Sequence, residues 1–592
     1  MNRLINLNLR ILLVGIIIIV VPVVRANNIT VSNISLTGQN TTDDYTFIRF
    51  GISWENSWRT SSAPNNWDAA WIFVKYKVGQ NYVSNAGATS SGTTITVSST
   101  TGLRTGMPIY VTSGTGVFPT GTIVSGIIDG TSFTVTSAPT TPLSGGASVV
   151  TGYAFWEHAT LSATGNIAPA GSTITTVPDN TGIFFYRDSD GSGTFSKSGV
   201  KLRWDYGLNS VGDNDIVDVK VFAIEMVYVP QGAFYLGSGG VETSHLYAYP
   251  TSNSSYYVSS EDEIPIGPSA GNLYYTVSGT AGDGLGPVPA AFPKGYNAIY
   301  VMKYEISQQA YVDFLNILTR TQQNTRTSAS LGAGVTTVAN RYVMVTLDAG
   351  SYGYPTPERR SGIKCDAVIS PTNPVTFYCD LNMNDIPNES DDGQNIACVY
   401  ISWADAMAYL DWAGLRPMTE LEFEKACRGP VMPVANEYAW GTASIVQNTA
   451  LTNSGQASEI SSVGTANCTY GNGILGPCRG GMFARAGTTR AQSGATYYGI
   501  LDMSGNLWER PVTIGNPQGR SYDGLHGNGL INTTGNANVS NWPGTDGLGS
   551  GFRAGYWASA SVIIRMSDRS DGAHGTDRRR ERFGGRGIRT AP

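Results

Sequence analysis

The chain has 592 residues, of which 41% are hydrophobic and only 14% charged, with a net charge of −6. This length is enough for roughly two to four domains, and the acidic balance excludes the basic surface that nucleic-acid binding requires. Low charge together with abundant glycine and tyrosine favours an extracellular, β-rich protein with many loops over a helical cytosolic enzyme.

Residues 1–26 have the pattern of a secretory signal peptide. Arg3 and Arg10 supply positive charge, residues 11–21 form an apolar run, and Ala26 is a small residue at a suitable cleavage point. An uncleaved membrane anchor is the alternative, but the run is shorter than the roughly 20 apolar residues that a span needs. We therefore expect a secreted or cell-surface protein without a transmembrane segment after cleavage.

The next part of the chain predicts an all-β sandwich made of two halves, residues 27–83 and 151–224. Both halves alternate apolar and polar residues in short runs separated by Gly, Asn and Ser turns. Residues 84–150 differ, because they carry almost no charge and are rich in Thr, Ser, Gly and Val. Their β-branched runs predict a small β module inserted into a hairpin loop, since loop tips accept insertions. Its composition is similar to that of β modules in bacterial surface proteins, and a disordered Ser/Thr linker is the alternative.

From residue 225 onward, short helices alternate with long irregular loops. Apolar residues at helical spacing predict three amphipathic helices, and Ser307 and Thr419 are suitable N-caps, the latter in a capping box with Glu422. The predicted helices cover residues 304–318, 402–412 and 419–427.

All the cysteines lie in this C-terminal part. Their even number in an exported chain predicts up to three disulfides. Disulfides within the closely spaced pairs Cys365/Cys379 and Cys468/Cys478 would close small loops, but the sequence does not determine the pairing. The absence of CxxC spacing and the low histidine count argue against zinc. The six are Cys365, Cys379, Cys398, Cys427, Cys468 and Cys478.

Six motifs then follow in order. They are MVYVPQGAFYLGS (226–238), YVMKYEISQQAYVDFLN (300–316), VYISWADAMAYLDWAGLRPMTELEFEKACRG (399–429), YAWG (438–441), YGILDMSGNLWE (498–509) and the segment from GFRAGYW to GGRGIR (551–589). Together they resemble the formylglycine-generating enzyme, or sulfatase-modifying factor, family. The resemblance implies an irregular α+β domain, related to C-type lectins, over residues 225–592.

Many matched residues have a structural interpretation. Large aromatics supply buried area in a domain with few helices, so we expect Trp403, Trp412, Phe423, Trp440 and Trp508 in the core. Four charged residues of the longest motif are expected to form a buried polar network rather than a catalytic set: Arg416, Glu420, Glu422 and Arg428.

The resemblance also implies a chemistry, namely oxidation of a substrate cysteine to formylglycine by copper(I) held between two C-terminal cysteines. Here the corresponding stretch, residues 555–570, contains Ser and Ala, and no cysteine follows Cys478. Because a serine hydroxyl is not a soft ligand, we expect no copper site and no oxidase activity. A second branch of the family uses histidine-bound iron, but no pair of histidines here has ligand spacing. The histidines are His158, His245, His526 and His574.

Two calcium sites are predicted. The family's structural calcium would be held by Asp502, Gly505, Leu507 and Glu509, and carboxylates combined with main-chain carbonyls suit this hard cation. A second, EF-hand-like loop has an aspartate where glycine is usual, so a solvated acidic loop is the alternative. Its candidate ligands are Asp380, Asn382, Asn384, Asn388 and Asp391.

Three classes of function remain open from the sequence. We favour a ligand-binding protein of lectin-like fold that recognises an extracellular protein, peptide or glycan and has no catalytic residues. An oxidase or other enzyme of the family and a structural cell-surface component are the alternatives. The expected ligand face consists of Tyr556, Trp557, Ser559, Ser561, Arg565, Asp568, Arg569, His574, Arg578 and Arg580.

Overall fold

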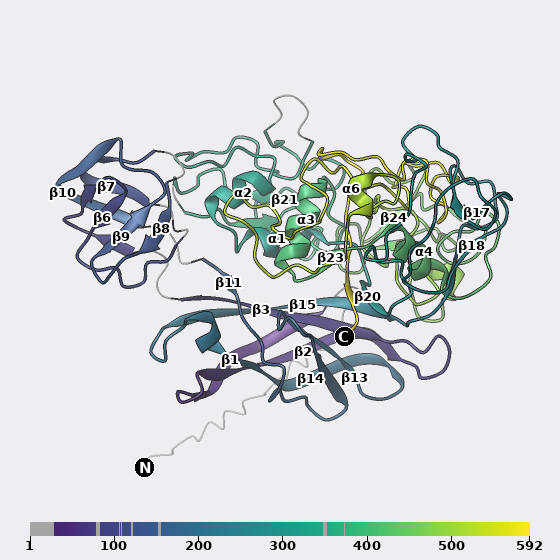
Figure 1. The fold of residues 1–592 in the computed structure, drawn as a ribbon, viewed down its shortest axis with the longest axis horizontal. Coiled ribbons are helices and arrows are strands. Elements are labelled where there is room, and N and C mark those ends of the chain that lie inside the picture. The colour runs from purple at the N-terminus through teal and green to yellow at the C-terminus, as the bar shows by residue number, and fades with distance from the viewer. Residues whose placement is uncertain are drawn as a thin grey trace, which may run out of the picture.

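The computed structural model is β-rich and comprises several sheets and a few short helices (Figure 1). It describes residues 29–78, 83–105, 107, 109–119, 122–151, 155–346, 352–371 and 373–592. The predicted signal peptide, residues 1–26, lies outside the described residues. Among those residues, no helix is long and apolar enough to cross a membrane.

The N-terminal part contains two antiparallel sheets that face each other. One sheet has the strand order β1–β2–β14, and the other includes β12, β13, β3 and β15, with β11 paired to β3. Alternate residues of β2 and β3, such as Phe50 and Ile72, are buried in one shared core, as expected for strands with one apolar face. The strands are β1 (Thr30–Asn40), β2 (Tyr45–Arg59), β3 (Asp68–Val78), β11 (Glu157–His158), β12 (Ser172–Thr176), β13 (Ile183–Arg187), β14 (Gly191–Trp204) and β15 (Val217–Val229), and a 3-10 helix spans Tyr206–Asn209.

The segment with little charge forms a separate β module, seen at the left of Figure 1. Its entry and exit strands pair with each other, because Val83 lies opposite Thr151, and its buried core is made of its own residues, such as Ile95 and Phe133. The module lies between β3 and β11, which are antiparallel neighbours. Its strands are β4 (Val83–Asn85), β5 (Thr89–Ser91), β6 (Thr94–Thr96), β7 (Ile109–Val117), β8 (Val124–Ile127), β9 (Ser132–Val135) and β10 (Thr141–Thr151).

The second N-terminal sheet continues into the C-terminal part of the chain. Strand β15 pairs with β3 on one side and with β20 on the other, and β26 and β23 extend the same sheet to eight strands within the described residues. The expected domain boundary at residue 225 therefore falls inside a strand. The added strands are β20 (Ile299–Met302), β23 (Arg416–Pro417) and β26 (Gly587–Thr590).

The C-terminal part packs short helices and loops around one large core. The three predicted helices are present; α1 and α3 are shorter than expected, and α4 has the expected length but begins one residue later. Ser307, Ser402 and Thr419 cap α1, α3 and α4. The capping box of Thr419 and Glu422 is confirmed. Helix α2 was not predicted, because its sequence RTQQNTR has no apolar face, and the four-residue helices α5 and α6 were not predicted either. The helices are α1 (Gln308–Leu315), α2 (Arg320–Arg326), α3 (Trp403–Trp412), α4 (Glu420–Arg428), α5 (Arg490–Ser493) and α6 (Pro517–Arg520).

Four two-stranded sheets complete this part of the chain. Their strands are β16 (Phe234–Leu236), β17 (Tyr247–Ala248), β18 (Tyr256–Val258), β19 (Leu273–Tyr274), β21 (Ile363–Cys365), β22 (Phe377–Cys379), β24 (Leu451–Thr452) and β25 (Ile460–Ser461). The aromatic anchors predicted from the motifs, from Trp403 to Trp508, are all buried.

The predicted disulfides are absent, because all six cysteines are free and buried. In the β21–β22 hairpin, Cys365 lies opposite Phe377, and Cys379 lies opposite Ile363, so the two thiols are not cross-strand partners. Cys468 and Cys478 belong to different core clusters. The cysteines therefore act as small apolar core residues.

Candidate functional site

Helix α4 carries three glutamates that meet buried arginines. Glu420 accepts hydrogen bonds from Arg553 Nη1 (3.2 Å) and Arg569 Nη2 (3.0 Å), and its Oε1 also accepts the Ile514 backbone N–H at 2.9 Å. Glu424 lies one helical turn further and binds Arg553 Nη2 at 2.7 Å. All these side chains are buried, which confirms the predicted polar network and extends it to arginines near the C-terminus.

This network removes part of the predicted ligand face from the surface. Arg569 is fully buried against Glu420, because the charge of the glutamate needs a partner inside the domain. Of the ten predicted residues, Trp557, Ser559, Asp568 and Arg569 are buried, Tyr556, Ser561, Arg565 and Arg580 are half-buried, and His574 and Arg578 are exposed.

The predicted calcium ligands lie in the turn at residues 502–509, which a third carboxylate from a distant segment approaches. Besides Asp502 and Glu509, the structure brings in Glu305, which the motif search did not single out. Leu507 N–H donates to Glu305 Oε1 at 3.0 Å, Gly481 N–H donates to Asp502 Oδ2 at 2.6 Å, and Arg586 Nε donates to Glu509 Oε1 at 2.7 Å. Burial, followed by the charges of Asp502 and Glu509, raises the pKa of Glu305 well above its usual value.

These residues fit a hard cation. Glu509 Oε2 is buried without a hydrogen-bond partner, and no hydrogen bond among the described residues uses the carbonyl oxygens of Gly505 or Leu507. Burial raises the pKa values of Asp502 and Glu509 as well. Arg586 pairs with Glu509, and within the described residues neither Glu305 nor Asp502 has an ion-pair partner of its own. Two carboxylates and two open main-chain carbonyls are the ligand types that calcium prefers.

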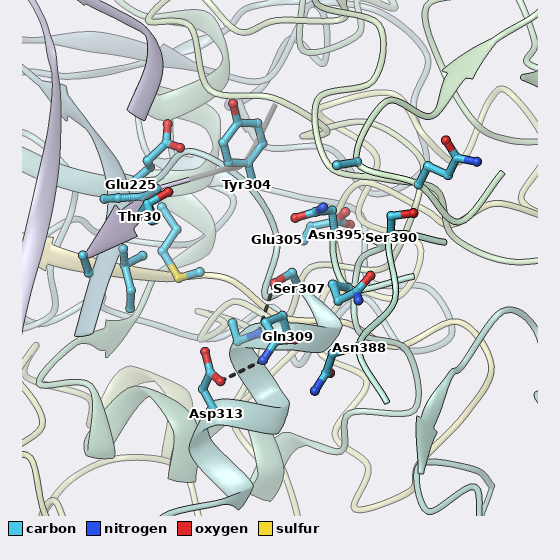
Figure 2. Close-up of a pocket in the computed structure, with 18 of the residues that line it drawn as sticks. Thr30, Glu225, Tyr304, Glu305, Ser307, Gln309, Asp313, Asn388, Ser390 and Asn395 are labelled. Atoms are coloured by element: carbon cyan, nitrogen blue, oxygen red, sulfur yellow. Dashed lines mark hydrogen bonds between the residues drawn. The ribbon is translucent and has the colours of Figure 1, made fainter. Parts of the chain in front are cut away.

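Next to Glu305 lies a cleft with a volume of about 690 Å³. Its walls come from β15, β20, helix α1 and the loops around residues 388–395 and 456–458. Figure 2 shows Gln309 and Asp313 on α1, where the Gln309 amide donates to Asp313 at 2.8 Å. The lining is rich in polar side chains, which include Glu225, Glu305, Asp313, Glu389, Ser307, Gln394 and Asn395. The volume is in the range of small-ligand sites.

The second predicted calcium loop divides into two parts. Asp380 is buried and paired with Lys364, and Asn388 Oδ1 accepts the Cys379 backbone N–H at 3.3 Å. Both therefore serve the β21–β22 hairpin.

The other part of the loop contacts a different set of carboxylates, namely Glu389, Asp391 and Asp392. The Asn382 amide donates to Asp391 Oδ1 at 3.0 Å, and the Asn384 amide donates to Glu389. Glu389 and Asp392 come close to Asp391, although the EF-hand spacing left both of them out. Burial and the surrounding acids raise the pKa of Asp392 to about 6.

Comparison with known proteins identifies the C-terminal part. A family model described as the sulfatase-modifying factor enzyme 1-like domain matches residues 218–591. The chain belongs to this family. The match begins at the second residue of β15, seven residues before the expected boundary.

Three curated relatives of the sulfatase-modifying factor family align with parts of the chain. Formylglycine-generating enzyme of Thermomonospora curvata is 31% identical over 119 residues, which are 20% of this chain and 33% of that enzyme. Inactive C-alpha-formylglycine-generating enzyme 2 of Mus musculus is 30% identical over 141 residues, 24% of this chain and 40% of the relative. Formylglycine-generating enzyme of Mycobacterium tuberculosis is 32% identical over 119 residues, 19% and 32% of the two chains. The chain thus aligns with less than half the length of each.

The residues present do not fit the copper(I) site that the sulfatase-modifying factor resemblance implies. Residues 555–570 contain no cysteine, and Ser559 there is buried, with its hydroxyl accepting the Tyr556 N–H at 3.0 Å. Burial raises the pKa of all six thiols elsewhere in the domain, which disfavours the thiolate that binds copper.

Proposed function

We propose that this chain is a secreted or cell-surface ligand-binding protein whose sulfatase-modifying factor domain does not generate formylglycine. The observation that carries the proposal is the absence of cysteine from residues 555–570 in a domain that the family model matches over residues 218–591. A relative named as an inactive formylglycine-generating enzyme supports retention of this domain without the reaction. The signal-peptide pattern of residues 1–26 supports export, and the loop-rich C-terminal domain supports the relation to C-type lectins.

The cleft beside helix α1 is the ligand site that we propose. Its volume of about 690 Å³ accommodates a small oligomeric ligand, and its hydroxyl, amide and carboxylate groups suit the many hydroxyl groups of a glycan. The exposed part of the predicted C-terminal face, with His574 and Arg578, is a polar surface that does not line this cleft. We therefore place glycan binding in the cleft rather than on that face.

Calcium at Asp502, Gly505, Leu507 and Glu509 is part of the same proposal. A bound ion would neutralise the neighbouring carboxylates, whose pKa values are raised by burial and by one another. It would also fix the turn next to Glu305, and Glu305 lines the cleft. The fit of the residues supports this assignment, and the role of the ion is structural.

The lack of oxidase activity is tested with the purified protein, copper(I) and a peptide that carries a sulfatase motif. Mass spectrometry should find the peptide cysteine unchanged, whereas an active relative in a parallel reaction converts it to formylglycine. Conversion by this protein would overturn the non-catalytic assignment.

Ligand binding is tested on a glycan array, with hits quantified by titration calorimetry. We expect Gln309→Ala combined with Asn395→Ala to weaken binding at least tenfold, while His574→Ala combined with Arg578→Ala leaves it unchanged. Loss only in the second variant would move the site to the C-terminal face, and binding of no glycan would refute the proposed ligand class.

A further inference from the structure

Three carboxylates outside the family motifs lie close together in the loop at residues 389–392, and one of them, Glu389, lines the cleft. The oxygens that Glu389, Asp391 and Asp392 can offer to a metal all lie within 4.8 Å of one another. Two oxygens bound to one calcium ion lie at most about 5 Å apart, because each Ca–O bond is about 2.3–2.6 Å long. The spacing is therefore short enough for one ion to bind all three residues.

In the described parts of the chain, no positive charge pairs with this group. Within the part of the chain that the structure describes, no lysine, arginine or histidine forms an ion pair with any of the three carboxylates. The neighbouring Lys364 and Arg341 are instead engaged by Asp380 and Asp385. Among the described residues, the side-chain donors to the three carboxylates are the neutral amides of Asn382 and Asn384.

A buried oxygen without a partner provides a second, independent indication of a missing ligand. The side chain of Asp392 is 0% exposed, and its Oδ1 atom has no hydrogen-bond partner, while its Oδ2 atom accepts the Glu389 N–H at 2.6 Å. Asp380 is also 0% exposed, with an Oδ1 atom that lacks a partner. Unpaired buried carboxylate oxygens are costly, and a bound cation would satisfy them.

We propose that Glu389, Asp391 and Asp392 bind a calcium ion in the loop beside the cleft that Glu389 lines. An oxygen-only ligand set excludes the softer metals that prefer histidine or cysteine. Calcium tolerates the irregular geometry of a loop better than magnesium, which demands a near-ideal octahedron.

This site is separate from the one at Asp502 and differs from the EF-hand assignment. It retains Asp391 and replaces Asp380 and Asn388, which serve the hairpin, with Glu389 and Asp392. Because Glu389 also lines the cleft, the ion would hold that wall in place.

The test counts calcium ions bound by the purified full chain after removal of metals by chelator. Equilibrium dialysis against calcium alone should give two ions for the wild type and one for Glu389→Gln combined with Asp391→Asn, both of which are partly exposed. Asp502→Asn should also give one ion, and the matched control, Asp262→Asn with Glu263→Gln at exposed positions, should give two. Thermal melting in chelator checks that each variant is folded.

The outcomes separate the two sites. A loop variant that binds as many ions as the wild type overturns the proposal. One ion in the wild type, lost only in the loop variant, upholds it and refutes the site at Asp502. Equal binding of magnesium in a parallel dialysis would contradict the choice of calcium.

Discussion

At the residue scale, the most demanding feature is the charge held inside the C-terminal domain. Glu420, Arg553 and Arg569 are completely buried, and each would be very costly there alone. They are tolerated because every charge meets an opposite one and most remaining hydrogen-bonding positions are used, as by Thr513 Oγ1 on Glu420 at 2.9 Å. Removing one partner should therefore cost much more than an exposed ion pair is worth.

We predict that Glu420→Gln lowers the free energy of unfolding by about 3–5 kcal/mol, because two arginines lose their buried counter-charge. Urea unfolding at pH 7 measures the change. The control is Asp218→Asn, which breaks the ion pair with Lys77 at a site where the aspartate side chain is 63% exposed, and its effect should stay within about 1 kcal/mol. Similar losses in both variants would contradict the network.

The same glutamate should make stability depend on acid pH. Burial opposes its ionisation, but Arg569 and Arg553 outweigh burial and lower the pKa of Glu420. A lowered pKa in the folded state gives stability that is complete above the unfolded value of about 4.3 and is lost as the pH falls through the folded value. The difference in unfolding free energy between wild type and Glu420→Gln should be constant from pH 7 to pH 5 and shrink below about pH 4. A constant difference down to pH 2.5 would refute this assignment.

At the scale of elements, strand β15 joins the N-terminal sheets to the family domain. It pairs with β3 over its first eleven residues and with β20 over its last four. The junction is also held by side chains, since Lys303 next to β20 binds Glu225 of β15 at 3.0 Å and Trp71 of β3 donates to the Ala413 carbonyl at 2.7 Å. The two parts of the chain thus share a sheet and a core.

We predict that residues 225–592 produced alone do not fold into a stable domain. Cutting at residue 225 removes most of β15 and all of β3, so the apolar surface that packs against Trp71 and Phe73 would be exposed. Circular dichroism and size-exclusion chromatography should show an aggregated or unfolded fragment, while residues 27–592 behave as a folded protein. A monomeric fragment with cooperative melting would disprove the dependence.

At the scale of the whole molecule, the inserted β module is the most independent part. Its core is built from its own residues, and one ion pair at 2.9 Å, between Arg104 and Glu157, connects it to β11. Its neighbours β3 and β11 are already paired antiparallel strands, so a short turn can replace it.

We predict that replacing residues 84–150 with a short Gly/Asn turn leaves the rest of the protein folded. Loop closure becomes less costly as the loop shortens, so the melting temperature should be retained or raised slightly. Differential scanning calorimetry of the variant that lacks the module and of the complete protein measures this change. Ligand binding in the cleft serves as the functional control. Loss of cooperative melting would show that the module contributes to the main core.

Part of this protein could be predicted from local sequence. The capped helices, the alternating strands and the buried aromatics follow from spacing and side-chain chemistry within a few residues, and the ordered motifs indicated the family domain. The absence of cysteine from residues 555–570 is likewise a property of the sequence alone.

Only the tertiary structure decided which distant residues meet. Glu305 lies about 200 positions before Glu509 in the chain, yet both belong to one group of neighbouring carboxylates. Arg569 was predicted to be a surface residue, but it is buried in an ion pair with Glu420. The cysteines that were expected to form disulfides are apolar core residues. The EF-hand spacing selected Asp380, but this carboxylate forms an ion pair with Lys364. Spacing along the chain determines local geometry, whereas charge pairing and burial depend on segments that the fold brings together.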